Sequence, residues 1–498
     1  MFGKWFTAAA LLAAGVSLVR ADASADLKAT VDKSLKAMGA ENVKTLVISG
    51  EGWDGCVGQP FNPNSLNWRK FSNKNYVRSI DFEARGWRLQ RVRGEGENPG
   101  RGGCNAGPVS DTPQNQVTMA GANAPWNTQL EYIFLPEGFL KVALEKNASV
   151  SPETIKGKKF TVVSFMGDNK APVNGYIDDM GYIEKVETKT DNNVLGDITW
   201  NAVYSDWKDF NGLKFPAKIE QWQGTPKYFE LAVADVKTNT PVDLTPPAGR
   251  GRGGAGGPGA AGAGRGGRGG APAGPMSEDL GGGFWLVTGG YGAVVADFKN
   301  FIVVIEGPQN DMRAEQVIAE AKRLVPNKPI KYVINTHAHF DHSGGLRAFV
   351  AEGSIIVTHQ VNKNYYEKIF KDPHTLVPDK LSQMNPKPKI KIETMTEKKV
   401  MTDGEHTIEI YHVQGSTHNE GMLIAYLPKQ KALIEADEFN VGQANAPTPA
   451  SINPYHTNLL ANIERLHLDV DRIIPVHLPN DGRKVTMAEL YTAAGKKN

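Results

Sequence analysis

Histidine is absent from the first 336 residues of the chain, and all eleven histidines lie between His337 and His477. Imidazole is the commonest metal ligand in proteins and the usual carrier of protons near neutral pH. Its absence excludes histidine-based chemistry from the N-terminal part of the protein. We therefore expect any such chemistry in the C-terminal part.

An excess of either charge is also lacking. Lys and Arg together number 56 and Asp and Glu 54, which gives a net charge of +2. A nearly neutral chain lacks the basic field that attracts phosphate backbones or anionic lipid surfaces. The sequence therefore predicts no nucleic-acid partner.

The apolar segment near the N-terminus is too short for a stable membrane span. It comprises the fifteen residues from Trp5 to Val19, whereas a transmembrane helix needs about 20. Lys4 precedes the segment, and the small residues Ala21 and Ala23 follow it, which is typical of a cleaved secretory signal. We expect residues 1–23 to be a signal peptide and the mature protein to be periplasmic or secreted.

Cysteine is scarce, and its only two representatives are Cys56 and Cys104. Export to an oxidising compartment would let them form a disulfide, and an even number of cysteines agrees with that. Two unrelated free thiols are the alternative. Both cysteines lie far upstream of the histidines in the sequence.

Residues 24–245 have the pattern of a separate, β-rich accessory domain. A helix-like stretch from Ala25 to Met38 precedes short alternating segments bounded by turn residues, which is typical of a mainly antiparallel sheet, and we expect that sheet to curve around the helix. Seven of the nine tryptophans fall in this region, where they either pack a core or line a ligand groove. No catalytic pattern is present, so the sequence leaves the role of this domain open.

Residues 246–274 consist mainly of Gly, Ala, Pro and Arg. Such a segment cannot bury enough apolar surface to offset its ordering entropy, so it predicts a flexible linker. From 275 to 498, strand-like and helix-like segments alternate. Three strand-like runs lie between Phe284 and Glu306, and an amphipathic helix follows from Met312 to Leu324. This alternation predicts an α/β domain.

Four side chains of metal-ligand type occur within six residues, directly after the apolar run from Tyr332 to Ile334. Neutral imidazole and carboxylate groups are ordinary ligands of zinc. On an extended loop, ligands two residues apart can close on one ion while their neighbours face a second ion. The density of such side chains therefore predicts a metal centre formed by His337, His339, Asp341 and His342.

Three isolated residues further along the chain have the same character. His418, Asp437 and His477 each lie close to the end of a short, apolar, strand-like run. Loops at the ends of buried strands are where binding sites usually gather. Each residue alone is more often structural, but together with the six-residue cluster they predict additional ligands.

This pattern resembles that of the metallo-β-lactamase superfamily, whose members include β-lactamases, lactonases, glyoxalase II, alkylsulfatases and tRNA-maturing nucleases. The resemblance covers roughly residues 282–485. It implies a four-layer αβ/βα sandwich with two zinc ions, or other divalent transition metals, at one edge. Its ligand assignment gives one ion His337, His339 and His418, gives the other Asp341, His342 and His477, and places Asp437 between them.

The resemblance also implies the chemistry. Two metal ions about 3.5–4 Å apart lower the pKa of a bound water and polarise the group that it attacks. It implies a hydrolase that uses a metal-bound hydroxide, with Asp341 binding metal and orienting that hydroxide. The family's β-lactamases carry cysteine or serine where this chain has Asp437, so we expect an ester or lactone as the small-molecule substrate and a β-lactam as the alternative.

A different class of function remains possible, namely a binding module whose metal domain is redox-active or vestigial. If the two regions are independent modules, a chain that begins near Met276 folds, binds metal and hydrolyses small esters without the N-terminal domain. The sequence leaves the oligomeric state open.

Overall fold

The computed structural model describes residues 24–65, 67–97, 100–104, 109–247 and 276–496. The expected signal peptide at 1–23, and all but the first two residues of the expected linker at 246–274, lie outside the described residues. Within the described part, no helix is both long enough and apolar enough to cross a membrane.

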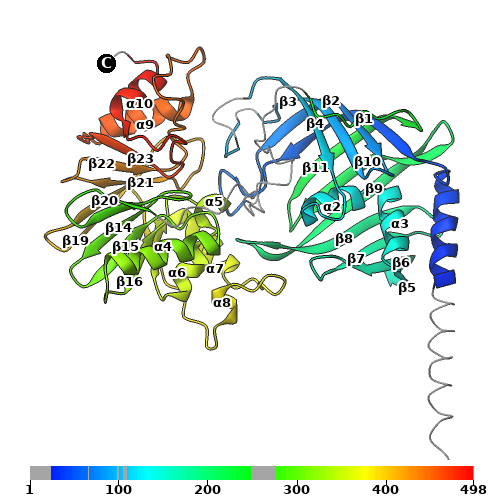
Figure 1. The fold of residues 1–498 in the computed structure, drawn as a ribbon, viewed down its shortest axis with the longest axis horizontal. Coiled ribbons are helices and arrows are strands. Elements are labelled where there is room, and N and C mark those ends of the chain that lie inside the picture. Colours follow the sequence, from blue (N-terminus) through cyan, green and yellow to red (C-terminus); the bar gives the residue numbers. More distant parts are fainter. Residues whose placement is uncertain (1–23, 66, 98–99, 105–108, 248–275, 497–498) are drawn as a thin grey trace, which may run out of the picture.

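The N-terminal domain is built on one large antiparallel sheet, as the alternating sequence pattern predicts (Figure 1). Its neighbouring strands follow one another in the sequence, except where the last strand, β11, closes on the first, β1. From one edge to the other the order is β4 (Thr112–Met119), β3 (Gly86–Glu95), β2 (Lys70–Asp81), β1 (Thr45–Gly55), β11 (Lys227–Thr238), β10 (Leu213–Gln223), β9 (Gly196–Phe210), β8 (Ile183–Asn192), β7 (Pro172–Ile177), β6 (Lys158–Met166) and β5 (Ser149–Ile155).

The helices that pack on this sheet are α2 (Trp126–Ile133) and α3 (Pro136–Glu145), which the sequence pattern did not reveal. Phe134, between them, contacts the ring of Trp200 on β9, and Phe139 contacts Phe165 on β6. The expectation that the sheet curves around the first helix is therefore wrong. That helix, at 24–38, lies against the hairpin turns, where the Ser34 hydroxyl donates to the carbonyl of Gly181.

Tryptophans of the N-terminal domain serve mainly as core residues. Trp68, Trp87 and Trp200 are each only 2% exposed, and Trp126 and Trp207 pack against the same apolar cluster. Large aromatic rings contribute much of the apolar area that a sheet buries. These five tryptophans therefore pack the core, as one of the two interpretations expected.

The C-terminal domain contains two sheets. The first has the order β12 (Ser277–Asp279), β13 (Phe284–Val287), β14 (Ala293–Phe298), β15 (Phe301–Ile305), β16 (Ile330–Ile334), β17 (Ile355–His359) and β18 (Ile392–Met395). The second has the order β19 (Lys398–Thr402), β20 (Thr407–His412), β21 (Leu423–Leu427), β22 (Ala432–Glu435), β23 (Arg472–Pro475) and β24 (Val485–Thr486). Strands β15 to β18 run parallel. Parallel neighbours need crossover connections, which agrees with the helices found between them.

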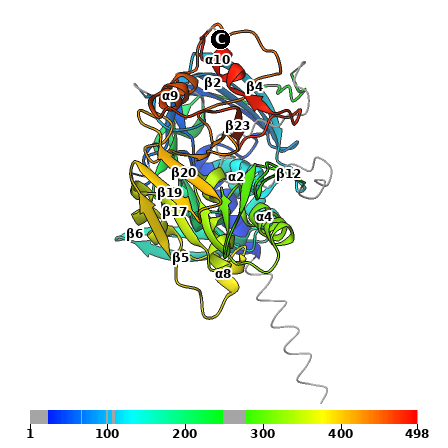
Figure 2. The same ribbon diagram turned by 90° about the vertical axis from the view of Figure 1, so that its left-hand side faces the viewer.

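Three apolar clusters show how the layers are stacked. Val303 on β15 and Ile410 on β20 belong to the cluster between the two sheets. On the outer face of the first sheet, α4 (Asp311–Leu324), α6 (Leu346–Ala351) and α7 (Lys363–Ile369) bury their apolar sides. On the outer face of the second, α9 (Pro454–Arg465) and α10 (Met487–Ala493) do the same. The order helix, sheet, sheet, helix confirms the four-layer αβ/βα sandwich (Figures 1 and 2).

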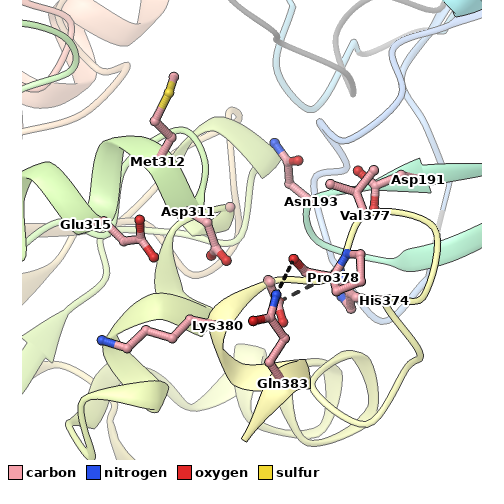
Figure 3. Close-up of a pocket in the computed structure, with 12 residues that line it drawn as sticks. Asp191, Asn193, Asp311, Met312, Glu315, His374, Val377, Pro378, Lys380 and Gln383 are labelled. Atoms are coloured by element: carbon pink, nitrogen blue, oxygen red, sulfur yellow. Dashed lines mark hydrogen bonds and ion pairs between the residues drawn. The ribbon is translucent and has the colours of Figure 1, made fainter. Parts of the chain in front are cut away.

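The two domains contact each other directly. The indole of Trp68 meets the ring of Phe340 edge-on, with 5.9 Å between ring centroids, and one apolar cluster extends across both domains. A second contact forms at Asp197 on β9, whose carboxylate accepts from the backbone N–H of Thr375 at 2.8 Å. A cavity of about 390 Å³ lies between these domains. Figure 3 shows Asp191 on one side of it and Asp311, from α4, on the other.

Glu137, in the first turn of α3, makes the stability of the protein depend on pH. Its side chain is 1% exposed, and burial raises the pKa of its carboxyl to about 7. The folded state therefore holds this proton more tightly than the unfolded chain does. The contribution to stability is fully present below the unfolded pKa and is lost as pH rises through about 7.

We expect Glu137→Gln to be more stable than the parent at about pH 8, by roughly 1–3 kcal/mol, with a smaller gain at about pH 5. The amide carries no charge at either pH, so it avoids the cost of burying a carboxylate. Thermal unfolding at both pH values measures the difference, with the exposed Glu51→Gln as control. An equal effect of Glu137→Gln at the two pH values would contradict this account.

Candidate metal centre

Both sheets deliver candidate ligands to the same edge of the sandwich. His337 and His339 follow β16, and the short helix α5 (Phe340–Ser343) carries the next two candidates. The loop between β20 and β21 and the ends of β22 and β23 supply the remaining ones. The seven residues predicted from the sequence therefore come together from five segments: His337, His339, Asp341, His342, His418, Asp437 and His477.

These side chains form two groups that share one carboxylate. The first ligand group comprises His337, His339, His418 and Asp437, and the second comprises Asp341, His342, His477 and Asp437. In each group, one nitrogen or oxygen from every member lies within 4.8 Å of those of the others. No further group of this kind occurs among the described residues.

Asp437 lies at the centre of the arrangement. Its Oδ2 atom is 3.0 Å from His342 Nε2 and 3.1 Å from His418 Nε2, and its Oδ1 atom is 2.7 Å from His477 Nε2. Tetrahedral zinc with bonds of about 2.0–2.1 Å holds its ligand atoms roughly 3.3 Å apart. The observed separations match that requirement, and the carboxylate faces both groups.

The backbone at Asp437 is held in an unfavourable conformation, with φ at +65°. A residue other than glycine pays a free-energy cost in this left-handed region, and such residues gather at functional sites. Glu306, at the end of β15, has φ at +84°. Both strained residues border the same cluster, because Glu306 Oε2 lies 3.3 Å from His342 Nδ1.

Hydrogen bonds orient the imidazoles and leave nitrogens directed inward. Thr336 Oγ1 contacts His337 Nδ1 at 3.1 Å and donates to Glu306 Oε2 at 2.5 Å. His339 Nε2 lies 3.1 Å from the carbonyl oxygen of Pro60, in the N-terminal domain. Among the described residues, His337 Nε2 and His339 Nδ1 are buried without a hydrogen-bond partner. A metal ion binds to the lone pair of a nitrogen of this kind, so these residues fit a metal.

Burial in the first ligand group favours the neutral form of His337 and of His339. Burial lowers the pKa of His337 to about 3, and the nearby His342 adds to this effect. Burial likewise holds the pKa of His339 well below its ordinary value. A histidine binds metal through a neutral nitrogen, so these two side chains can bind a metal ion without first releasing a proton.

The second ligand group has the opposite balance. Burial alone lowers the pKa of His342, but the carboxylates of Asp437 and Asp341 outweigh it and raise that pKa well above its usual value. Burial raises the pKa of Asp437, but the charges of His342 and its neighbours outweigh it and depress that pKa. Two ionised carboxylates so near each other need positive charge beside them. A divalent cation supplies it without requiring a protonated histidine.

One side of the centre is open. The side chains of His477 and Asp341 are 31% and 25% exposed, whereas that of His337 is 0% exposed. The centre is therefore accessible to solvent on the side of the second ligand group. The first ligand group is closed off by the protein.

Tyr291, in the turn between β13 and β14, lies at this open side and was missed by sequence reasoning. Its hydroxyl is 3.4 Å from Asp341 Oδ2, and its ring centroid is 4.3 Å from that of His477. Burial raises the pKa of this phenol above its ordinary value, and Asp341 adds to the rise. No sequence signal marked it, because an isolated tyrosine in a glycine-containing turn has many structural explanations.

Gln59 was missed as well. It belongs to the N-terminal domain, yet its Nε2 donates to Asp341 Oδ1 at 2.7 Å. The two residues are 282 positions apart in the sequence. No local pattern reports a contact of that kind.

The other acids and histidines near the centre have different surroundings. Glu435 and Glu438, the nearest carboxyls to Asp437 in sequence, are buried outside both ligand groups. Burial raises the pKa of Glu438 to about 8, and its Oε1 accepts from Ser416 Oγ. His359 stacks on His412 with 4.4 Å between ring centroids, and it belongs to neither ligand group.

The cavity of Figure 3 is separate from the metal centre. Its walls are formed by α4, by the segment from His374 to Gln383 and by the hairpin that carries Asp191 and Asn193. None of the seven candidate ligands lines it. It is part of the junction between the domains.

Comparison with known proteins agrees with this geometry. A family model described as the metallo-beta-lactamase superfamily matches residues 305–477. The alpha subunit of 2,4-dinitroanisole O-demethylase from Nocardioides sp. (strain JS1661) is 23% identical over 203 residues, which are 40% of this chain and 57% of that protein. The chain thus spans little more than half the length of this curated relative.

Solved structures resemble the C-terminal domain. A metallo-beta-lactamase from Pontibacter korlensis shares 18% identity, with a TM-score of 0.34, and the match covers 44% of this chain and 97% of that one. The metallo-beta-lactamase FIM-1 from Pseudomonas aeruginosa shares 16% identity, with a TM-score of 0.32 and coverage of 44% and 93%. Rubredoxin oxygen:oxidoreductase from Desulfovibrio gigas shares 16% identity, with a TM-score of 0.34 and coverage of 44% and 61%.

The family match spans the strands and loops that carry all seven candidate ligands, from the end of β15 to His477. The sandwich that holds them is the fold that the sequence resemblance implied. The C-terminal domain of this chain matches the metallo-β-lactamase superfamily over residues 305–477.

Proposed function

We propose that the protein is an exported, zinc-dependent hydrolase that cleaves an ester or a lactone. The observation that carries this proposal is the arrangement of five imidazoles and two carboxylates in two ligand groups that share Asp437. The match to the superfamily agrees with a hydrolase. The choice of zinc follows from ligands that are imidazole and carboxylate groups.

Two divalent ions bound in these groups would lower the pKa of a water between them and polarise the substrate oxygen. The protein's own residues supply position and access. Asp437 keeps the two groups together, and Asp341 presents its carboxylate at the open side. Tyr291 keeps its proton because its pKa is raised, so its hydroxyl can donate to a substrate oxygen beside Asp341.

The substrate class rests on Asp437. A β-lactam is the second candidate, because the family includes β-lactamases, but those enzymes carry cysteine or serine at this position. The curated relative is named for the demethylation of 2,4-dinitroanisole. That compound therefore belongs among the substrates to be tested beside esters, lactones and β-lactams.

Export is supported by Cys56 and Cys104, which form a disulfide with 6.1 Å between their Cα atoms. Disulfides persist mainly in oxidising compartments such as the periplasm and the extracellular space. The expectation of a signal peptide at 1–23 points the same way. The proposed location is periplasmic or secreted.

The alternative of another class is a binding module whose metal domain is redox-active or vestigial. A vestigial centre would not need seven side chains aimed at two shared points, and here none of the seven is displaced from the cluster. The intact set therefore favours an active enzyme.

Metal content provides the first test of the proposed function. The protein purified with zinc should contain about two equivalents, and His337→Ala combined with His339→Ala should lose about one, because the second ligand group keeps its own histidines. Elemental analysis after gel filtration measures the ratio. The control is His467→Asn, an exposed histidine with φ at +53°, a conformation that asparagine tolerates.

A parent protein that takes up no transition metal on titration would overturn the proposed metal centre. Equal metal loss in the His467→Asn control would show that the histidine replacements act through folding. Circular dichroism of every variant shows whether a loss of metal is accompanied by a loss of folded structure.

The second prediction concerns the shared carboxylate. Asp437→Asn keeps a side chain of the same size that tolerates the positive φ, but it removes the charge that faces both ligand groups. We expect zinc affinity to fall by about 10–100-fold and turnover to fall at least as much, with little change in thermal stability of the metal-free protein. Chelator competition gives the affinity. Turnover that stays at the parent level in a zinc-saturated variant would contradict the shared role.

The third prediction concerns the reaction. Zinc-loaded protein should hydrolyse activated esters or lactones faster than a β-lactam or 2,4-dinitroanisole, and a chelator should abolish the activity until zinc is restored. Initial rates across one panel at fixed enzyme concentration decide the order. A β-lactam or the anisole as the best substrate would replace the proposed substrate class while leaving the metal centre intact.

A further inference from the structure

Two short loops of the N-terminal domain lie against the metal centre, and we call residues 56–61 and 101–104 the docking loops. The disulfide between Cys56 and Cys104 joins them covalently. The backbone N–H of Gly103 also donates to the carbonyl of Gln59 at 3.1 Å. The two docking loops are therefore linked to each other and form one unit.

The first docking loop contacts the segment that carries the clustered ligands. The backbone N–H of Phe340 donates to the carbonyl of Gly58 at 3.1 Å. The imidazole of His339 meets the carbonyl of Pro60 through Nε2, also at 3.1 Å. Between these two contacts, the amide of Gln59 donates to Asp341 at 2.7 Å. One docking loop thus contacts three consecutive residues of the ligand segment, 339 to 341.

Both docking loops also contact the segment that carries His418. The backbone N–H of Gly102 donates to the carbonyl of Thr417 at 2.9 Å. The side-chain amide of Asn419 donates to the carbonyl of Pro60 at 3.2 Å. The residues on either side of His418 are therefore bound to the N-terminal domain. The same carbonyl of Pro60 serves ligand segments from both sheets.

Packing holds the docking loops in place. Trp68 meets Phe340 edge-on, and a Cβ at Gly58 would come within 2.5 Å of the Phe340 ring. The hydroxyl of Tyr455 on α9 donates to the carbonyl of Gly102 at 3.0 Å. Contacts this close leave little room for movement of the loops relative to the ligands.

From these contacts we infer that the N-terminal domain completes the metal centre, with Gln59 as a positioning residue for Asp341 and the Pro60 carbonyl as the hydrogen-bond partner of His339. The inference rests on the proposed metal-dependent function. Groups that hydrogen-bond to metal ligands fix the orientation of those ligands, and their loss typically costs about 10–100-fold in metal affinity or activity. Here those groups come from another domain of the same chain.

This inference gives the N-terminal domain a role that the sequence left open. It also disagrees with two independent modules, because a chain that begins near Met276 would lack the partners of His339 and Asp341. The first ligand group would then be exposed on the side that the docking loops now cover.

Gly103 offers a way to test the role of Gln59 in the full-length protein. A Cβ at Gly103 would lie 1.8 Å from Gln59 Oε1 and 3.0 Å from His339 Cε1, so Gly103→Ala must push the flexible amide away from Asp341. Gly121→Ala is the matched control, because nothing lies within 4 Å of a Cβ there. Gln59→Met removes the hydrogen bond directly while keeping a side chain of similar length.

We expect Gln59→Met and Gly103→Ala each to weaken the binding of one zinc equivalent by about 10–100-fold and to alter the visible spectrum of the cobalt-substituted protein, with Gly121→Ala unchanged. Chelator competition measures affinity, and the cobalt spectrum reports ligand geometry independently of turnover. At saturating zinc we expect kcat to fall with little change in KM, because Gln59 acts through Asp341.

The outcomes separate this inference from the proposed function. Parent protein that binds two zinc ions, together with Gln59→Met that matches the parent in zinc affinity, cobalt spectrum and kcat, overturns the positioning role alone. Parent protein that binds no metal overturns the proposed function instead. If Gly103→Ala does not fold, Gln59→Met still decides the question, since it adds no atom to a crowded position.

Discussion

The arrangement of the two ligand groups depends on one side chain, the carboxylate of Asp437. Its two oxygens face histidines from both ligand groups, and it occupies a backbone conformation that costs free energy. An ionised carboxylate in so buried a place is tolerated only beside compensating positive charge. Charged histidines provide part of that compensation, and divalent ions would provide it with imidazoles left neutral. The strained backbone aims this one side chain at both groups.

The layered fold of the C-terminal domain brings the candidate ligands together at one edge. Ligands reach the centre from the ends of strands in two different sheets, and a cluster of apolar side chains holds the sheets face to face. Helices on both outer faces complete the burial. Rigid strands position side chains more accurately than long loops do, which a site with separations near 3 Å requires. The loops themselves are short and pinned by hydrogen bonds to Glu306 and to the N-terminal domain.

The two domains are in direct contact, so they are not joined by the linker alone. Apolar packing between Trp68 and Phe340 joins the two, and the docking loops place backbone carbonyls against the segments that carry the ligands. A disulfide holds the two docking loops together at this point. The disulfide thus joins the same two loops that contact the segments carrying the ligands.

The amino-acid sequence by itself determined the seven candidate ligands, the sandwich of the C-terminal domain and the antiparallel character of the N-terminal sheet. The ligands and the N-terminal sheet have local signatures, namely clustered histidines, alternating apolar residues, or an apolar run that ends at a polar side chain. The strands around Tyr332 and Arg472 and the helix around Val317 could be predicted for that reason. The sandwich was implied by the resemblance of the ligand pattern to the metallo-β-lactamase superfamily. Only the tertiary structure decided the roles of α2 and α3, which are short, and the roles of Tyr291, Glu306 and Gln59. Gln59 meets Asp341 across 282 residues of chain, and a hydrogen bond over that separation leaves no periodic trace in the sequence. It exists because two cores pack against each other, which is a property of the folded protein rather than of any segment.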